Sequence, residues 1–287
     1  MGWLAQFVDG IALGCTYALV ALGYTLVFGV LNVLNMAHGD LFMVGSYCGF
    51  ICGLFITQNP VVAILFGFLG AGIIGLIMER LAIRPVFKEH LTPLLTTVGV
   101  SVILQNSVQK IFGPNQQNFP FEFKSVTLWG YLRLPSIAIV NLGVSVLIMV
   151  FLFLFIEKTK YGWAIKSVAE KPETAGMLGV NVKKIMSLTV GFASALGGVA
   201  GVLLGMTLGS ISPFMGTNFG IKGLTVLIVA GTGHIVGAML FGLILGLIEV
   251  YSVSILSSAY RDLISVIILI LIFLVRPQGL FGKASRA

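Results

Sequence analysis

Long uncharged stretches alternate with short polar ones along almost the whole chain. Residues 11–31 and 136–156 each carry no charged side chain, and about 20 residues is the length that a helix needs to cross the hydrocarbon of a bilayer. An outer-membrane barrel would instead show alternating segments of about 10 residues. Because only a helix satisfies its own backbone hydrogen bonds in lipid, the pattern predicts an all-α, polytopic membrane protein. We expect one transmembrane domain over residues 1–287.

Seven segments are expected to cross in full, and a less regular region adds two pieces. The seven are residues 9–31, 41–57, 60–80, 94–112, 136–157, 185–208 and 259–276. In the region 221–254, residues 223–231 are too short to cross alone, whereas residues 234–253 are long enough. The sequence GTGH between them marks a break. The prediction is therefore eight or nine crossings, some of them broken or re-entrant.

Charge is scarce, and its distribution orients the chain. Charged residues make up 9% of the sequence and hydrophobic residues 57%, whereas a soluble domain carries roughly 25% charge. Most of the Lys and Arg residues fall in 80–88, in 158–184 and after residue 275. The positive-inside rule places these regions, and the C-terminus, in the cytoplasm. The N-terminus and the loop 113–135 are then expected outside, and the net charge of +7 reflects topology rather than nucleic-acid binding.

Glycines spaced four residues apart predict close helix packing. Without side chains at such positions, two helix backbones approach and gain dispersion contacts. The rows are Gly45, Gly49 and Gly53; Gly197, Gly201, Gly205 and Gly209; and Gly242 with Gly246.

Motifs for enzymatic chemistry are missing from the sequence. There is no G-x-x-x-x-G-K-[ST] loop, so this chain is not expected to hydrolyse ATP, and neither H-E-x-x-H nor G-x-S-x-G occurs. Cys15, Cys48 and Cys52 all lie in apolar segments with no further ligands nearby, which favours packing over metal binding. No metal, cofactor or catalytic residue is predicted.

The segment 160–184 is the one cytoplasmic stretch too long for a simple turn. Its apolar positions predict an amphipathic helix ending near Gly179. The residues alone leave open whether this helix enters a groove on a partner or is a solvated basic loop that sets topology.

Seven short motifs follow one another along the chain, each occurring once. They are LNMAHGD (34–40), ERLAIRP (79–85), TTVGVSVILQN (96–106), FGP (112–114), AEKPETAGMLGVN (169–181), GLILGLIE (242–249) and RPQGLFGK (276–283). Each is weak alone, but together they resemble the branched-chain amino-acid permeases of ATP-binding-cassette importers, from about residue 10 to residue 283.

The resemblance implies partners. A second homologous permease, two cytoplasmic ATPase subunits and an extracytoplasmic substrate-binding protein complete such an importer in a bacterial inner membrane, and ATP and Mg²⁺ are bound by the ATPases. In this family a short cytoplasmic helix of the permease docks on the ATPase, and residues 164–179 match it. The positions implied for this coupling are Ala164, Ala169, Glu170, Ala175 and Gly179. A bulky Arg at Ala175 is expected to block the coupling.

The implied substrate is a zwitterionic aliphatic amino acid, whose two charged groups need compensation inside the membrane. Broken helices supply it, because free N–H groups at a helix start favour an anion and free carbonyls favour a cation. Residues 35–40 and 218–226, the latter with GTGH, are interpreted as such breaks in two half-repeats. The predicted substrate path comprises Asn35, His38, Gly39, Asp40, Gly220, Lys222, Gly223 and His234.

More specific roles are expected for His38, Asp40 and His234. On a helix, His38 and Asp40 are about 200° apart, so they do not form a ligand pair, and we expect them to fix a break near the path, with Asn35 or Asp40 as a cap. The family usually reads GGLGSIPGA where this chain has AGTGHIVGA (230–238). His234 there replaces a small polar residue, a departure that bears on the substrate rather than on the family.

Charged residues inside spans face a cavity or a partner. Glu249 is expected at a permease interface or paired with a basic residue such as Arg261. Arg261 and Asp262 are expected to compensate each other at the outer surface, and Glu79 to lie among the headgroups.

Two other readings remain. A urea or amide permease of the same importer class would use a similar membrane subunit. A stand-alone secondary transporter would not need the long basic segment, and it would carry more paired charges for ion coupling.

Overall fold

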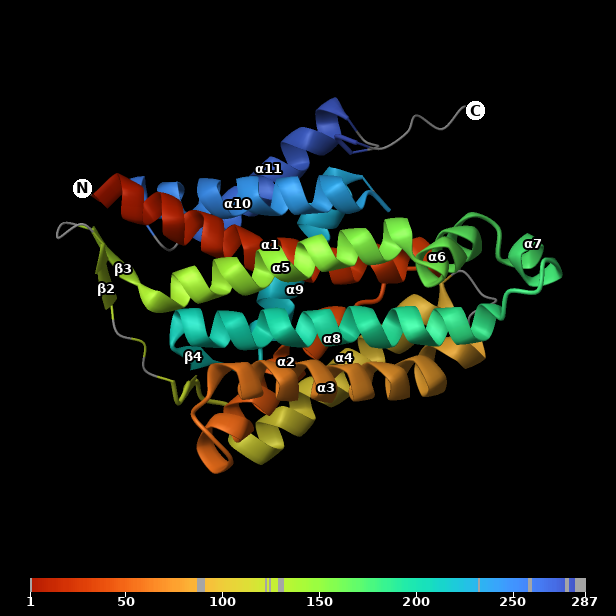
Figure 1. Cartoon of the computed structure of the whole chain (residues 1–287), viewed down its shortest axis with the longest axis horizontal. Helices are drawn as coiled ribbons and strands as arrows, with labels where there is room; N and C mark the ends of the chain where they lie inside the picture. The colour runs from red at the N-terminus through yellow and green to blue at the C-terminus, as the bar shows by residue number, and fades with distance from the viewer. Residues whose placement is uncertain are drawn as a thin grey trace.

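The computed structural model describes residues 2–86, 91–121, 123, 125–128, 132–231, 233–257, 260–276 and 279–281. Each of the nine apolar segments predicted from the sequence is a helix, so the all-α fold is confirmed (Figure 1). These helices are α1 (Gly2–Leu31), α2 (His38–Phe55), α3 (Pro60–Met78), α4 (Thr92–Phe112), α5 (Ser136–Lys158), α8 (Val182–Leu208), α9 (Met215–Ala230), α10 (Ile235–Ile255) and α11 (Arg261–Val275).

Five helical segments of the described chain are long and apolar enough to cross a membrane. They are Trp3–Leu31, Pro60–Val86, Ser136–Lys158, Val182–Leu208 and Ile235–Ile255, and α9 is a shorter apolar helix. The chain is therefore a multi-pass membrane protein. The predicted number of eight or nine crossings stays a prediction.

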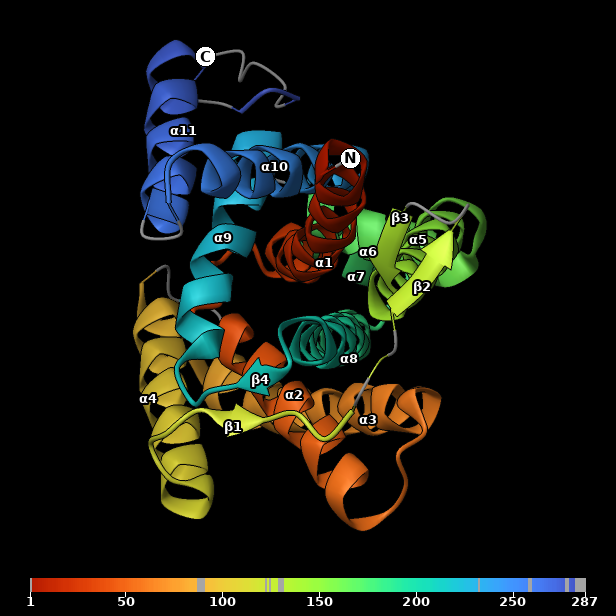
Figure 2. The same ribbon diagram turned by 90° about the vertical axis from the view of Figure 1, so that its left-hand side faces the viewer.

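Helices α1 and α8 form the centre of the bundle and are buried on almost all sides (Figure 2). A helix that is apolar all round belongs in such a position. In Figure 1, α10 lies along α1 on one side, and α2 and α3 lie along α8 on the other. The outward faces of α3, α5 and α11 are rich in exposed apolar side chains.

Glycines make the closest helix crossings, as their spacing predicted. A Cβ added at Gly45 of α2 would overlap the backbone of Gly198 in α8, and one added at Gly198 would overlap the carbonyl oxygen of Gly67 in α3. The same holds between α10 and α1, where Gly246 lies against Gly14. Gly209 is different: it ends α8 in the left-handed conformation, with φ +67°.

Short elements occupy the two ends of the bundle. The strands β2 (Ser125–Leu128) and β3 (Leu132–Pro135) form an antiparallel hairpin at one end, and α6 (Lys160–Glu170) and α7 (Pro172–Met177) lie at the opposite end (Figure 1). Strands β1 (Gln117–Asn118) and β4 (Ser210–Ile211) pair near the hairpin end. The segments 113–135 and 158–184, predicted on opposite sides of the membrane, thus lie at opposite ends.

The last turn of α3 continues as a π-helix, η1 (Glu79–Ile83), and a 3₁₀ turn, η2 (Arg84–Val86). Glu79 was expected among the headgroups, but its side chain is buried. It accepts hydrogen bonds from Arg84 Nε at 3.1 Å and from Ser187 Oγ at 2.8 Å. This network joins the end of α3 to the start of α8 and compensates the buried carboxylate.

The helical conformation is interrupted between α9 and α10, at the predicted GTGH. Gly231 and Gly233 have φ values of +96° and +86°, which residues with a Cβ rarely adopt; Thr232 lies outside the described residues. The amides of Leu280 and Phe281 donate to the carbonyls of Val229 and Ala230 at 2.7 and 3.2 Å. Residues that follow α11 in the sequence therefore supply hydrogen bonds to the end of α9. The C-terminal residues 282–287, predicted in the cytoplasm, lie outside the described part.

Candidate functional site

The first predicted break, between α1 and α2, is present. Residues 32–37 are not helical, and Asn32 has φ +50°. The side-chain oxygen of Asn35 accepts a hydrogen bond from the amide of Ala37 at 3.1 Å, so Asn35 stabilises this turn. Asp40 lies in the first turn of α2, where a negative charge interacts favourably with the helix dipole.

The start of α2 packs against α9, so the two predicted break segments meet. A Cβ on Gly39 would overlap the carbonyl oxygen of Gly216, and one on Gly220 would lie 3.1 Å from the Cα of Gly39. Glycine at these three positions lets the two backbones touch. The prediction of a break within 218–226 is wrong, however, because α9 begins at Met215 and runs unbroken through this segment.

A third helix joins this crossing through one amide side chain. Gln105 of α4 donates from Nε2 to Asp40 Oδ1 at 2.9 Å and to Thr217 Oγ1 at 2.8 Å. Gln105 thus connects α2, α4 and α9. Gln105 belongs to the motif TTVGVSVILQN, but nothing local in the sequence indicates that its side chain reaches a carboxylate on another helix.

His38 fills a space between α1 and α8. Its ring is fully buried, with its centroid 4.5 Å from that of Tyr24. A Cβ on Gly23 would overlap the ring, and one on Gly197 would lie 3.7 Å from Nε2. Neither ring nitrogen has a hydrogen-bond partner within the described residues. The packed ring of His38 therefore fixes the start of α2. Its two ring nitrogens, without hydrogen-bond partners among the described residues, lie beside the contact between α2 and α9.

On the side of α9 away from α2 and α4, four charged side chains form a cluster. Lys222 and Glu249 are 4% and 1% exposed and form an ion pair, in which the ammonium group donates to the carboxylate. Lys222 Nζ also lies 3.0 Å from Asp262 Oδ1, and Arg261 Nε lies 3.0 Å from Glu249 Oε1. We call Lys222, Glu249, Arg261 and Asp262 the charge quartet.

The charge quartet connects α9, α10 and α11, and its two positive charges balance its two negative ones. The predicted pairing of Glu249 with Arg261 is confirmed. The expectation that Arg261 and Asp262 compensate each other is wrong, because each is paired with a buried residue of another helix. Tyr17 of α1 completes the surroundings: its hydroxyl lies 3.3 Å from Lys222 Nζ, and its ring centroid 5.4 Å from the same atom.

The remaining predicted path residues lie elsewhere. Gly223 faces α1, where a Cβ would lie 2.5 Å from the side chain of Val20. His234 precedes α10 as its N-cap residue and is half-buried. It follows the end of α9, and ten residues of helix from Gly220 span about 15 Å. The structure thus brings His38, Gly39, Asp40 and Gly220 together, but not His234.

The predicted coupling helix over 164–179 is wrong as a single helix, because it is interrupted. Lys171 has extended φ and ψ values of −150° and 96°, and α7 starts at Pro172. Proline disfavours the helical conformation at the residue before it, so this stop signal prevails over the apolar pattern that predicted one continuous helix. The predicted end at Gly179 is confirmed. Gly179 has φ +87°, and the amides of Gly179 and Val180 donate to the carbonyls of Gly176 and Ala175 in a Schellman motif.

The predicted coupling positions differ in how far their side chains are exposed. Ala169, Glu170 and Gly179 are exposed and Ala164 is half-buried, whereas Ala175 is only 3% exposed. An Arg at position 175 would therefore disrupt α7 itself instead of blocking a docking surface. The large apolar side chains that α7 and its C-cap present outward are those of Met177 and Leu178, 87% and 80% exposed.

These features define a class of protein: a multi-pass helical membrane protein with its polar groups gathered at helix crossings and an exposed helical element at one end. The family model described as "Branched-chain amino acid transport system / permease component" matches residues 6–273. The chain belongs to this family. It is a permease component of an ATP-binding-cassette transporter, the non-catalytic membrane part, and this implies an ATPase and a binding protein as partners.

Individual relatives agree over nearly the whole length. The chain is 36% identical to the high-affinity branched-chain amino acid transport system permease protein LivH of Escherichia coli K12, covering 98% of this chain and 96% of the relative. It is 34% identical, with the same coverage, to BraD of Pseudomonas aeruginosa. The ribose import permease RbsC of Escherichia coli K12 is 25% identical over 90% of this chain and 81% of its own.

A solved structure shares the fold. The chain is similar to one in the structure of PsaBC from Streptococcus pneumoniae in complex with Fab, with a TM-score of 0.52 and 13% identity. The similarity covers 96% of this chain and 92% of the other. At this identity the likeness concerns the fold alone.

Proposed function

We propose that this permease takes up leucine, isoleucine or valine across a bacterial inner membrane, from an extracytoplasmic binding protein that delivers them. The observation that carries the proposal is the near full-length similarity to permeases named for branched-chain amino acids. The ribose permease is more distant and is matched over less of its length. We therefore place the substrate among aliphatic amino acids.

The outward face of α9 supports a second permease as a partner. In Figure 2, α9 lies at the edge of the bundle between α4 and α11. Thr217 and Asn218 are exposed there, next to Gln105. Polar side chains of a membrane helix normally face a protein interior or a water-filled cavity instead of lipid. A second, homologous permease covering this face would build the path between the two subunits.

A zwitterionic aliphatic substrate fits this face. The side chains of Gln105 and Thr217 offer hydrogen-bonding groups to an ammonium and a carboxylate, with the buried carboxylate of Asp40 positioning Gln105 from behind. Ile221, half exposed on α9, offers apolar surface to the substrate's side chain. The uncommitted nitrogens of His38 lie behind the crossing. Lys222 is committed to the charge quartet, so we assign it to positioning α9 instead of touching the substrate.

The end that carries α6 and α7 is placed in the cytoplasm, together with the C-terminus. Six lysines lie in residues 158–184 at this end, as the positive-inside rule requires. Two ATPase subunits, one for each permease, would bind ATP and Mg²⁺ and dock on α7. Met177 and Leu178 are the apolar contacts offered to them.

The proposal is tested by uptake of labelled leucine into vesicles that contain the complete importer. An excess of isoleucine or valine is expected to suppress uptake, whereas urea and ribose are expected to leave it unchanged. Competition by urea but not by valine would assign the chain to the amide importers. The isolated chain in liposomes is expected to transport nothing, and leucine uptake by it alone would favour a secondary transporter.

Replacing both Met177 and Leu178 by Asp is expected to abolish copurification of the ATPase. Burying two carboxylates in an apolar contact is unfavourable, and a central interface residue contributes about 2 kcal/mol, or roughly a 30-fold change in affinity. The measurement is the amount of ATPase retained by the tagged permease.

The matched control is Ile56→Asp, an exposed apolar residue after α2, at the hairpin end of the bundle. It is expected to retain the ATPase fully. If Ile56→Asp loses as much ATPase as the double variant, the docking site is not on α7.

A further inference from the structure

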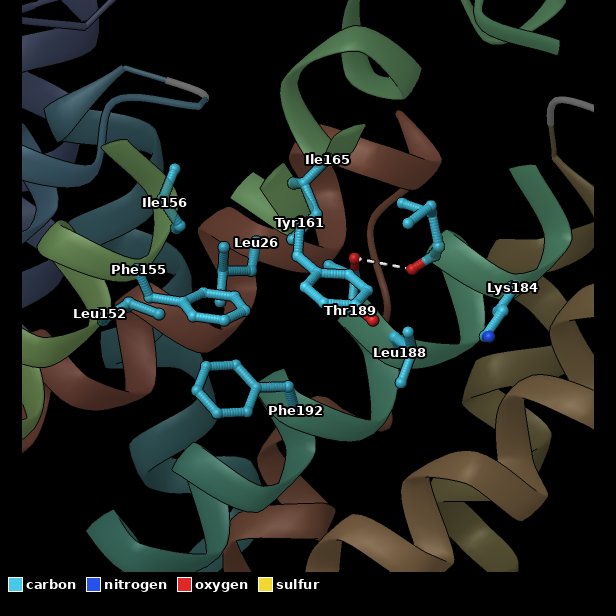
Figure 3. Close-up of a pocket in the computed structure, with 11 residues that line it drawn as sticks. Leu26, Leu152, Phe155, Ile156, Tyr161, Ile165, Lys184, Leu188, Thr189 and Phe192 are labelled. Carbon is cyan, nitrogen blue, oxygen red and sulfur yellow. Dashed lines mark hydrogen bonds between the residues drawn. The ribbon is translucent and has the colours of Figure 1, made fainter. Parts of the chain in front are cut away.

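An apolar cavity of about 340 Å³ lies between α1, α5, α6 and α8, where α5 ends and α6 begins. Leu152 and Phe155 of α5 and Leu188 and Phe192 of α8 line it, and Figure 3 shows the rings of Phe155 and Phe192 on one side and Tyr161 of α6 on the other. Its volume lies within the range of small-molecule sites. The cavity plays no part in the crossing of α2 and α9.

Polar side chains in the lining are few. They are Tyr161, Lys184 and Thr189, and the Thr189 hydroxyl already donates to the carbonyl of Ile185 at 2.8 Å. Lys184 is exposed, and among the described residues no carboxylate lies within ion-pair distance of it. The cavity is therefore amphipathic, with an apolar interior and one uncompensated cation in its lining.

The positive charges around Lys184 favour the binding of an anion there. Lys183 and Lys184 both stand in the first turn of α8, which holds no acidic residue. The start of a helix carries a partial positive charge, so cations there are unfavourable and an anion is favourable. Lys166, by contrast, is neutralised by Glu157. This end of the bundle thus carries unpaired positive charge beside an apolar cavity.

We propose that the cavity binds an anionic phospholipid, with one acyl chain between α5 and α8 and the phosphate at Lys184. The place where α5 passes into the basic segment is the level at which headgroups meet acyl chains. An acyl chain gains little by moving from the bilayer into an apolar cavity, because lipid tails are as apolar as the side chains. Selection between lipids therefore rests on the headgroup charge and on Lys184.

The test is native mass spectrometry of the full chain with equal amounts of phosphatidylglycerol and phosphatidylcholine of identical acyl chains. Wild-type protein is expected to retain phosphatidylglycerol in preference. Lys184→Gln is expected to lower that preference about fivefold, the contribution of one lysine near an anionic headgroup. The matched control, Lys183→Gln, removes a neighbouring lysine that does not line the cavity, and it is expected to lower the preference clearly less than Lys184→Gln does.

A second variant tests the cavity itself. Leu188→Trp, at a half-exposed position, fills it and is expected to reduce retention of both lipids. Equal retention of the two lipids by the wild type would show that the cavity does not select an anionic headgroup, and it would overturn the proposal. Equal losses in the two lysine variants would mean diffuse attraction to a basic surface, which also overturns it. Should Leu188→Trp fail to fold, the exposed lysine variants still decide the question.

Discussion

Replacing Lys222 by Met is expected to lower the free energy of unfolding by about 3 kcal/mol, the cost of removing one partner from a buried ion pair. Glu249 would stay buried with only the partly exposed Arg261 nearby, and Asp262 would lose its partner. The measurement is the unfolding midpoint of the purified chain in detergent micelles. The double variant Lys222→Met/Glu249→Leu is expected to recover most of the loss, because no unpaired charge then stays buried: Arg261 and Asp262 are 30% and 75% exposed and can be solvated.

The matched control for this variant is Lys166→Met. Lys166 forms an ion pair with Glu157 at a solvent-exposed position, with 47% and 42% of the two side chains exposed. Exposed pairs contribute about 0–1 kcal/mol. If Lys166→Met shifts the midpoint as much as Lys222→Met, burial of the charge quartet does not matter for stability.

Gly198→Ala is expected to destabilise the bundle by about 3 kcal/mol or more, at the upper end of the cost of overpacking. The added methyl group would overlap the carbonyl of Gly67 and lie 2.6 Å from the Cβ of Ala71. Because the obstacle at Gly67 is backbone, α3 and α8 must separate. The expected readout is loss of the monodisperse peak in size-exclusion chromatography, or a lower unfolding midpoint.

Gly143→Ala, in the middle of α5, is the control, since no atom lies within 4 Å of the added methyl group. It is expected to change the free energy of unfolding by less than about 1 kcal/mol, the difference in helix propensity between the two residues. An equal loss in both variants would show that the contact with Gly67 is not the cause.

The sequence predicted every long helix, because each apolar run is near the length that a membrane requires and is bounded by polar residues. The break at GTGH was also predictable, since paired glycines mark positive φ values. The interruption at Lys171, directly after α6, was predictable too, because Pro172 follows it and proline disfavours the helical conformation at the preceding residue.

Side-chain partners were harder to predict. The pairing of Lys222 with Glu249 and Asp262 depends on how α9, α10 and α11 are placed, and residues far apart in the sequence give no local sign of it. The same holds for Gln105, whose acceptors Asp40 and Thr217 lie on two other helices, and for the burial of Ala175 and Glu79. Glycine rows predicted where backbones meet, because a missing side chain is visible in the sequence itself.

The hydrogen bonds from Leu280 and Phe281 to the end of α9 have a consequence for biosynthesis. During synthesis α9 emerges before α10 and α11. The carbonyls of Val229 and Ala230 therefore lack the amide donors of Leu280 and Phe281 until the segment beyond α11 has left the ribosome. The end of α9 therefore obtains these two hydrogen bonds only after the segment beyond α11 has been synthesised. An affinity tag fused directly after these residues would act on α9, whereas a tag at the N-terminus would spare it.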